Sequence, residues 1–390
     1  MKFTVIGFGQ CGNRIADEFA RINTKARRER GIEIAPAVFA INTDTADLSG
    51  LTHIPDNFRH RILIGGRKTG GHGVGKVNEI AAEIAKQDSA RIFDAVRSTP
   101  RAFESDAFLL VASGAGGTGS GSISVTTQIL RERYRDKPLY ALVVLPFEHE
   151  ELTEERTIYN TALCLKSINS VADAVLLVDN QRFVGIGSSL SNNYADINRL
   201  IVEPFYDLLC AGEETNSRRV GTKTLDAGDV IQTLEGWTVL GYGKSQLSVF
   251  NLPFKQSSFR TKGTQTQKGV QALDKALSDL SVECNVSDAT KALYLVSGPG
   301  NELNTELVRE VGEYLRGLLP QATIRNGDYP RERVNLGVHL MLSGFTSVDK
   351  VKQYYARSII FIQEMKRRRE QREISLQEME DFGKELPRLL

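Results

Sequence analysis

The first half of the chain alternates short apolar runs with longer segments of helical periodicity. Between the apolar runs, Ile15, Phe19 and Ile22 share one helical face, and a second helical pattern spans residues 77–96. Strands that alternate with helices are typical of a parallel sheet covered by helices. The pattern therefore predicts a mainly parallel α/β domain over residues 1–190. Its expected strands are residues 2–6, 38–41, 61–64, 107–112, 139–145 and 174–178.

The second half has a different order of elements. A long helical pattern at residues 192–210 predicts a central helix within residues 191–212. The order that follows is typical of a smaller α+β domain, which we place at residues 213–345. Residues 346–390 are predicted to form C-terminal helices, the last of them restarting at a capping-box pair, Ser375 and Glu378. In the smaller domain, strands are expected at 237–240, 292–296, 322–324 and 334–342, and helices at 269–280 and 302–319.

Composition narrows the class of protein. The 390 residues include 49 basic and 48 acidic ones, so no net field favours nucleic acid or a membrane surface, and neither partner is expected. The four cysteines form no CxxC pair, which argues against a disulfide framework or a zinc site. No apolar run approaches the ~20 residues of a membrane span, and the first residues lack a long apolar signal region. We expect a cytoplasmic protein without membrane insertion.

The candidate chemistry is concentrated in a glycine run, SGAGGTGSGS at residues 113–122, directly after a predicted strand. Without side chains, the backbone N–H groups of this run are accessible. The next helix, predicted to begin near Ser122, adds about half a positive charge at its N-terminus. A flexible linker would not stand between a buried strand and an amphipathic helix. The run therefore predicts a phosphate-binding loop.

Two further glycine loops follow other predicted strands. The first, at residues 7–12, reads GxGxxG and is typical of dinucleotide sites, but the acidic residue expected about 20 positions later comes late, at Asp44. The second, at residues 70–76, nearly matches a P-loop, but Val77 stands where a hydroxyl would bind Mg²⁺. A dehydrogenase and a P-loop NTPase stay as alternatives. One nucleotide cleft at the carboxyl ends of the strands accounts for all three loops.

Together these loops are similar to those of the tubulin and FtsZ superfamily, which binds GTP without a P-loop. GFGQCGN at residues 7–13 resembles the first nucleotide loop of tubulins, NTD at 42–44 resembles that of FtsZ, and GAGGTGSG at 114–121 resembles the shared phosphate-binding signature. The resemblance covers nearly the whole chain. NTDTADLSGLTHIP and KTGGHGVGK are similar to the archaeal CetZ group. The resemblance implies a Rossmann-like GTPase domain that binds GTP or GDP with Mg²⁺.

The resemblance also implies particular nucleotide contacts. Tyr194 would stack on guanine, while Asn198, one helical turn further on, and Asn180 would bond its edge. From the residues alone, an ordinary core or groove position is the favoured interpretation of Tyr194. Glu150 and Arg156 are the ribose candidates, in a stretch that departs from the family pattern. The loop positions are Gly9, Gln10, Cys11, Asn13, Asn42, Asp44, Gly71, Gly73, Gly114, Ala115, Gly116, Gly117, Thr118, Gly119 and Ser120, with Gln10 and Asp44 also expected near Mg²⁺.

Asp226 and Asp229 lie three residues apart at a predicted helix start. From the residues alone, this pair is typical of a helix N-cap. The spacing also resembles the catalytic loop of FtsZ, although Thr224 stands where that family has asparagine. The resemblance implies that the two carboxylates orient the water that attacks a γ-phosphate bound to the neighbouring subunit.

The implied function is a GTPase that assembles head-to-tail into filaments and turns over only when assembled. For the CetZ group, the resemblance implies a cytoskeletal role in cell shape. An FtsZ-type division-ring protein and a scaffold that binds nucleotide without hydrolysis are the alternatives. Residues 246–268 carry three phenylalanines among basic and hydroxyl residues and are candidates for lateral contacts, although an ordinary surface loop explains the same composition.

Overall fold

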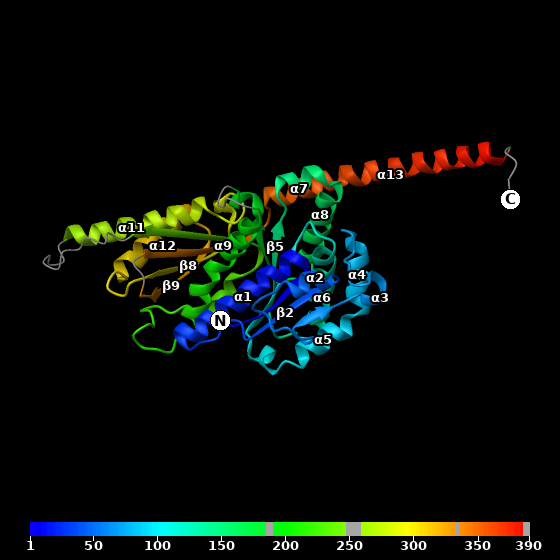
Figure 1. Cartoon of the computed structure of the whole chain (residues 1–390). Coiled ribbons are helices and arrows are strands. Elements are labelled where there is room, and N and C mark those ends of the chain that lie inside the picture. The colour runs from blue at the N-terminus through cyan, green and yellow to red at the C-terminus, as the bar shows by residue number, and fades with distance from the viewer. Residues whose placement is uncertain (185–189, 247–258, 333–334, 385–390) are drawn as a thin grey trace.

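The computed structural model describes residues 1–184, 190–246, 259–332 and 335–384. A ten-stranded sheet runs through this part of the chain in the order β3-β2-β1-β4-β5-β6-β7-β10-β8-β9 (Figure 1). The strands of the first half are parallel and lie within two residues of their predicted bounds. They are β1 (Phe3–Phe8), β2 (Ala37–Asn42), β3 (Arg61–Leu63), β4 (Ala107–Ser113), β5 (Leu139–Leu145) and β6 (Ala174–Asp179).

Helices cover both faces of this parallel half, which confirms the predicted α/β fold. Neighbouring residues of β1 belong to different cores, Val5 to one and Ile6 to the other, and both are fully buried. Burial on both faces explains why these strands are continuous apolar runs rather than alternating ones. The helices are α1 (Gly9–Arg30), α2 (Thr45–Ser49), α3 (Gly66–Thr69), α4 (Asn78–Gln87), α5 (Ser89–Arg97), α6 (Thr118–Arg133), α7 (Glu148–Thr153) and α8 (Glu155–Asn169).

The helical pattern at residues 77–96 forms two helices, α4 and α5, rather than one. The break is at Asp88, whose carboxylate accepts a hydrogen bond of 2.6 Å from the amide of Gly65. The backbone of Asp88 leaves the helical conformation, with φ −93° and ψ 15°, while its side chain bonds a distant loop. Apolar periodicity is preserved across the break, so the sequence pattern did not reveal it.

The predicted smaller α+β domain is confirmed, and its strands continue the same sheet. β7 pairs in parallel with β6 and antiparallel with β10, and is longer than predicted because Gly241 and Gly243 interrupt its apolar pattern. A Cβ at these positions would lie 2.5 and 1.9 Å from carbonyl oxygens of α11, so the glycines allow the helix to approach closely. The elements are α9 (Leu190–Ala211), α10 (Ala227–Thr233), β7 (Gly236–Gln246), α11 (Phe259–Ser278), β8 (Lys291–Gly298), α12 (Thr305–Leu318), β9 (Thr323–Pro330) and β10 (Asn335–Phe345).

The chain ends in one long helix, α13 (Asp349–Lys384), which extends away from the body in Figure 1. The predicted restart at Ser375 is therefore wrong, because the helix continues through this position. A capping-box pattern is only a start signal where the preceding backbone leaves the helix. Near its beginning, α13 is attached to α7, since Tyr354 and Arg357 both bond the carboxylate of Glu151.

A buried polar cluster joins α9 to the second half of the sheet. The Asp207 carboxylate pairs with Arg331 and lies 3.1 Å from Nε2 of His339, whose Nδ1 is 3.0 Å from the carbonyl oxygen of Pro204. Burial, followed by the nearby charge of Arg331, lowers the pKa of His339 to about 3. This imidazole therefore stays neutral in the folded protein at pH values where an exposed histidine is charged.

We expect this histidine to make folding stability fall in acid. Below about pH 6.5 the unfolded chain binds a proton at His339 that the folded chain does not, so the contribution is complete above pH 6.5 and is lost toward pH 3. The loss is at most about 1.4 kcal/mol per pH unit. Denaturant unfolding between pH 4 and 7 measures it. His339→Gln should reduce the dependence of the free energy of unfolding on pH, whereas the exposed control His72→Gln should leave it as in wild type. An unchanged pH dependence in His339→Gln would contradict the inference that His339 causes it.

Candidate functional site

Two helix N-termini meet at the carboxyl ends of neighbouring strands. α1 begins at Gly9 directly after β1, and α6 begins at Thr118 soon after β4, which pairs in parallel with β1. Gly9 has a φ of 66°, and a Cβ there would lie 2.9 Å from the backbone nitrogen of Gly119. The two positive helix ends are therefore in contact. Their free N–H groups and combined dipoles favour an anion beside them.

The glycine run is partly helical, which corrects the prediction that the helix begins near Ser122. Gly119 and Gly121 lie inside α6. A Cβ would come within 2.9 Å of the Phe8 carbonyl oxygen at Gly119 and within 2.1 Å of the Asn78 carbonyl oxygen at Gly121. These glycines allow close packing between backbones, and only residues 114–117 form the loop itself.

The structure brings the other two loops to the same place. The amide of Thr45 donates to the carbonyl oxygen of Gly71 at 3.0 Å, and the amide of Gly73 donates to that of Thr43 at 3.1 Å. The hydroxyl groups of Thr43 and Thr118 are 2.7 Å apart. The NTD loop, the loop at residues 70–76 and the start of α6 thus form one connected group, as the single-cleft hypothesis requires.

Gln10 and Asp44, the predicted Mg²⁺ contacts, are joined through a residue that the sequence analysis missed. The carboxylate of Asp47 accepts 2.8 Å and 3.0 Å hydrogen bonds from the side-chain amides of Gln10 and Asn42. Asp44 caps α2 by accepting from the amides of Ala46 and Asp47. The D-x-x-D spacing at the start of α2 could have indicated Asp47, because an acidic residue at the third helical position commonly partners the N-cap.

Asn160 of α8 is a second residue that was missed. Its buried side-chain amide donates to the carbonyl oxygens of Lys76 at 2.9 Å and Ala115 at 3.1 Å, so it ties two glycine loops together. Lys76, the lysine of the near P-loop match, pairs instead with Glu154. Its ammonium group is therefore engaged outside the loop, which disfavours the P-loop alternative. Nothing in the periodicity of α8 distinguishes Asn160 from a residue of its polar face.

We expect Asn160→Ala to loosen the loops. The substitution leaves a buried carbonyl oxygen of Ala115 and a partly buried one of Lys76 without their donor, which lowers the free energy of unfolding by about 1–3 kcal/mol. It should also weaken guanine-nucleotide affinity, since the loops lose their alignment. Chemical denaturation and nucleotide titration measure the two effects. Asn169→Ala, at the exposed end of α8, is the matched control. Equal stability of both variants would contradict the inference that Asn160 holds the two loops together.

Buried polar atoms around these loops fit a polar ligand. Asn13 accepts from the amide of Ile41 through Oδ1, but its Nδ2 has no hydrogen-bond partner within the part of the chain that the structure describes, and the same holds for Oδ1 of Asn78 and Asn160. Such atoms destabilise a fold unless water or a ligand bonds them. In the described ranges, no three His, Cys, Asp or Glu side chains gather as a metal site.

The predicted base-binding residues gather beside the first loop. The ring of Tyr194 on α9 meets that of Phe147 edge to face at 5.8 Å, and Asn198 lies one turn further along this helix. Glu150 bonds the backbone amide of Phe147 at 3.0 Å. Burial, with a contribution from Glu150, raises the pKa of Cys11 to about 12, and the same two causes raise the pKa of Tyr194. Both side chains are therefore uncharged at neutral pH.

Two predicted contacts stay apart from this group. Asn180 begins a short 3₁₀ turn after β6, and Arg156 pairs with Glu79 at 2.5 Å and lies over the ring of Tyr159. Within the residues that the structure describes, neither Asn180 nor Arg156 bonds a glycine loop. Because its guanidinium group pairs with Glu79, Arg156 is a weaker candidate for a ribose contact.

Asp226 and Asp229 form the helix cap that the residues alone predict. The Asp226 carboxylate accepts from the amide of Asp229 at 2.8 Å, and the Asp229 carboxylate accepts in return from the amide of Asp226 at 3.3 Å. Asp229 also lies 3.5 Å from Nε of Arg325. Asp226 is exposed, so its carboxylate remains accessible to another molecule.

These aspartates lie at the opposite end of the sheet from the glycine loops. A Cβ on Gly212 would be 3.2 Å from the backbone nitrogen of Met1 and 3.6 Å from Cα of Asp226, so Asp226 is near the beginning of β1. Gly9 follows its far end. Six strand residues span about 20 Å, so the two groups are separated by roughly that length. Within one chain, Asp226 does not reach an anion bound at the helix N-termini.

Comparison with known proteins agrees with this architecture. Residues 2–188 match the GTPase domain of the tubulin/FtsZ family, and residues 187–359 match the C-terminal domain of tubulin-like CetZ proteins. The tubulin-like protein CetZ1 of Haloferax volcanii is 33% identical, with 90% of each chain covered.

Two solved structures share the fold. A GDP-bound monomer of CetZ1 from Haloferax volcanii has a TM-score of 0.78 at 31% identity, covering 92% of this chain and 99% of that one. A GTPγS-bound protofilament of CetZ2 from Haloferax volcanii has a TM-score of 0.79 at 28% identity, covering 94% of this chain and 100% of that one. On its sequence, its two matched domains and its fold, the chain belongs to the tubulin/FtsZ family and, within that family, to the tubulin-like CetZ proteins.

Proposed function

We propose that this protein is a GTPase that assembles head-to-tail and completes each active site between two subunits. The separation of the two halves of the site carries the proposal. The glycine loops lie at the carboxyl ends of the parallel strands, and Asp226 lies at their amino ends. Stacking one subunit on the next in the same orientation would bring these two ends together. The CetZ2 relative has been solved as a GTPγS-bound protofilament, which supports such stacking.

In the proposed site, the backbone amides at the starts of α1 and α6 hold the phosphates. Tyr194 and Asn198 receive the guanine, where the amide of Asn198 can both donate and accept. Gln10 and Asp44 would lie near Mg²⁺. Mg²⁺, when bound, neutralises charge on the phosphate oxygens. Glu150, Asn180 and Arg156 remain candidate ribose or base contacts.

The neighbouring subunit contributes the carboxylates of Asp226 and Asp229. They accept hydrogen bonds from a water molecule and orient it toward the γ-phosphorus, in line with the leaving GDP oxygen. The water's oxygen forms a bond to phosphorus as the bond to GDP breaks, one of its protons passes to an aspartate carboxylate, and the products are GDP and inorganic phosphate. Since phosphoryl transfer depends mainly on positioning and electrostatics, a subunit without its neighbour binds GTP but turns it over slowly.

Dependence of turnover on protein concentration tests the proposal. We expect phosphate release per subunit to rise with protein concentration and to reach a plateau once filaments sediment. GTP binding per subunit, measured with a non-hydrolysable analogue, should stay constant over the same range. A turnover rate per subunit that is flat across this range would exclude a site shared between subunits.

The cellular role that we propose is cytoskeletal, in the control of cell shape rather than division. The kinship with CetZ proteins supports it. The candidate for lateral contacts, residues 246–268, falls largely outside the described residues. No described helix combines the length and apolar character needed to cross a bilayer. A location in the cytoplasm stays a prediction.

A further inference from the structure

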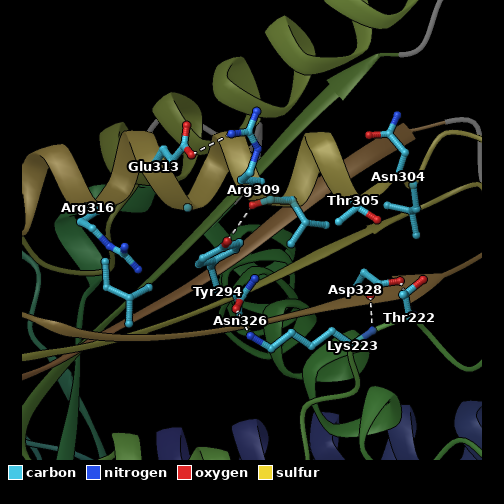
Figure 2. A pocket seen from close by; sticks show the side chains of 14 residues that line it. Thr222, Lys223, Tyr294, Asn304, Thr305, Arg309, Glu313, Arg316, Asn326 and Asp328 are labelled. Carbon is cyan, nitrogen blue, oxygen red and sulfur yellow. Dashed lines mark hydrogen bonds and ion pairs between the residues drawn. The ribbon is translucent and has the colours of Figure 1, made fainter.

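A cavity of about 330 Å³ lies between α12 and the outer strands β8 and β9 (Figure 2). Its volume is in the range of small-molecule sites. Part of the wall is apolar, from the buried ring of Tyr294 and the side chains of Leu303, Val308 and Ile324. None of the predicted nucleotide-binding residues lines it, so the cavity is distinct from the site at the glycine loops.

The polar rim of this cavity carries excess positive charge. Its two carboxylates are engaged: Glu313 pairs with Arg309 at 3.1 Å, and Asp328 accepts from the backbone amides of Thr222 and Lys223 at 2.9 and 2.7 Å. Among the described residues, no carboxylate lies within ion-pair distance of Arg316 or of the Lys223 ammonium group, which donates to the neutral side chain of Asn326.

The two available cations converge on the same part of the cavity. Figure 2 shows Arg316 reaching down from α12 and Lys223 reaching in from the loop before α10, on either side of Tyr294 and Asn326. A guanidinium and an ammonium group placed beside an aromatic wall suit an anionic head attached to an apolar body. A neutral apolar molecule would bring no opposite charge to either cation.

The strand that lines the cavity also contacts the loop of Asp226 and Asp229. Side chains alternate along β9, so Ile324, Asn326 and Asp328 face the cavity while Arg325 faces away from it. On that other side, Arg325 lies 3.5 Å from the carboxylate of Asp229. A shift of β9 at the cavity therefore moves a direct contact of Asp229.

The backbone provides a second connection. Asp328 and Lys223 bond each other in both directions, since the amide of Asp328 also donates to the carbonyl oxygen of Lys223 at 3.0 Å. A Cβ on Gly221 would lie 1.9 Å from the carbonyl oxygen of Asp328, so this segment packs tightly along the edge of β9. Lys223 is three residues before Asp226. A ligand that bonds Lys223 therefore acts on the segment that positions Asp226.

We propose that this cavity binds a small organic anion, a carboxylate on an aromatic or branched aliphatic body, and that its occupancy alters the position of Asp226 and Asp229. Binding itself depends only on the cavity. The regulatory effect on hydrolysis rests on the function proposed above, so the two are measured separately.

Titration calorimetry on the GDP-bound protein, with 2-naphthoate as the probe, tests the binding. Arg316→Gln should lower the affinity for 2-naphthoate about tenfold. The neutral analogue 2-naphthamide should bind wild type more weakly than 2-naphthoate by a similar factor. Val308→Trp should remove binding by filling the cavity. Arg372→Gln, an exposed cation on α13, is the control and should bind like wild type. Absence of heat at millimolar probe, or equal affinity of wild type and Arg316→Gln, would overturn the site.

Amide hydrogen exchange tests the coupling without requiring turnover. Saturating 2-naphthoate should change exchange of amides in residues 221–233 by about fivefold or more in wild type and leave it unchanged in Arg316→Gln. Binding without any change in these amides would overturn the coupling. If exchange changes but assembled wild type shows no GTP turnover, the proposed GTPase fails while this site and its coupling stand.

Discussion

Asp226→Asn and Asp229→Asn are each expected to lower GTP turnover in assembled protein by about 10²–10⁴-fold, the range associated with loss of a positioned general base. Asparagine is as good an N-cap as aspartate, so Asp226→Asn keeps the hydrogen bond to the Asp229 amide that caps α10. The substitution therefore separates the capping role from the charge. Phosphate release measures turnover, and a non-hydrolysable GTP analogue measures binding, which should be unchanged.

Asp349→Asn is the matched control, because Asp349 is also an acidic residue in the first turn of a helix. It should retain wild-type turnover. If Asp226→Asn and Asp229→Asn also turn over GTP at the wild-type rate, the aspartates only cap α10 and take no part in hydrolysis.

Gly116→Val is expected to remove nucleotide binding without unfolding the protein, with an affinity loss of about 100-fold or more, or roughly 2.7 kcal/mol. A Cβ at Gly116 meets no protein atom within 4 Å, and its φ is not in the left-handed region. A side chain there fills only the space in front of the loop. Gly317→Val, which is also sterically free, serves as the control. Nucleotide titration and thermal unfolding measure the two effects, and unchanged affinity would show that the phosphates lie elsewhere.

These two classes of variant together test whether the site is shared. Asp229→Asn keeps an intact nucleotide loop, and Gly116→Val keeps intact aspartates. Each alone should be inactive, but a mixture that coassembles should regain turnover, because the nucleotide of one variant meets the carboxylates of the other. A mixture no more active than its two components would place the carboxylates and the nucleotide in the same subunit, or in unrelated sites.

The parallel half of the fold was predictable because its strands are buried on both faces. Continuous apolar runs such as residues 139–145 have bounds that coincide with β5. The second half was harder, since Gly241 and Gly243 interrupt β7 where α11 approaches, and Asp88 ends α4 through a bond to a distant loop. Both departures depend on tertiary contacts, which local periodicity does not encode.

In the candidate site, too, the features with a local sequence motif were predictable and those that depend on tertiary contacts were not. The glycine motifs located the three loops, and the spacing of Asp226 and Asp229 predicted their cap. Asn160, which joins two of the loops, was missed because a single polar residue on a helix has no local signature of what it bonds. Asp47 was missed although its D-x-x-D spacing with Asp44 is a local signal. The assignment of Tyr194 and Asn198 came from family resemblance, and the placement of Tyr194 beside Glu150 is compatible with it.

The placement of the two half-sites at opposite ends of β1 has a consequence for any head-to-tail polymer of this chain. One terminus of such a polymer always exposes a nucleotide that no neighbour covers, and the other exposes aspartates with nothing to act on. The two termini are thus chemically different, whatever the length of the polymer. Under the proposed mechanism, the newest nucleotide at the uncovered terminus persists until the next subunit arrives, so growth and hydrolysis are timed by the same event.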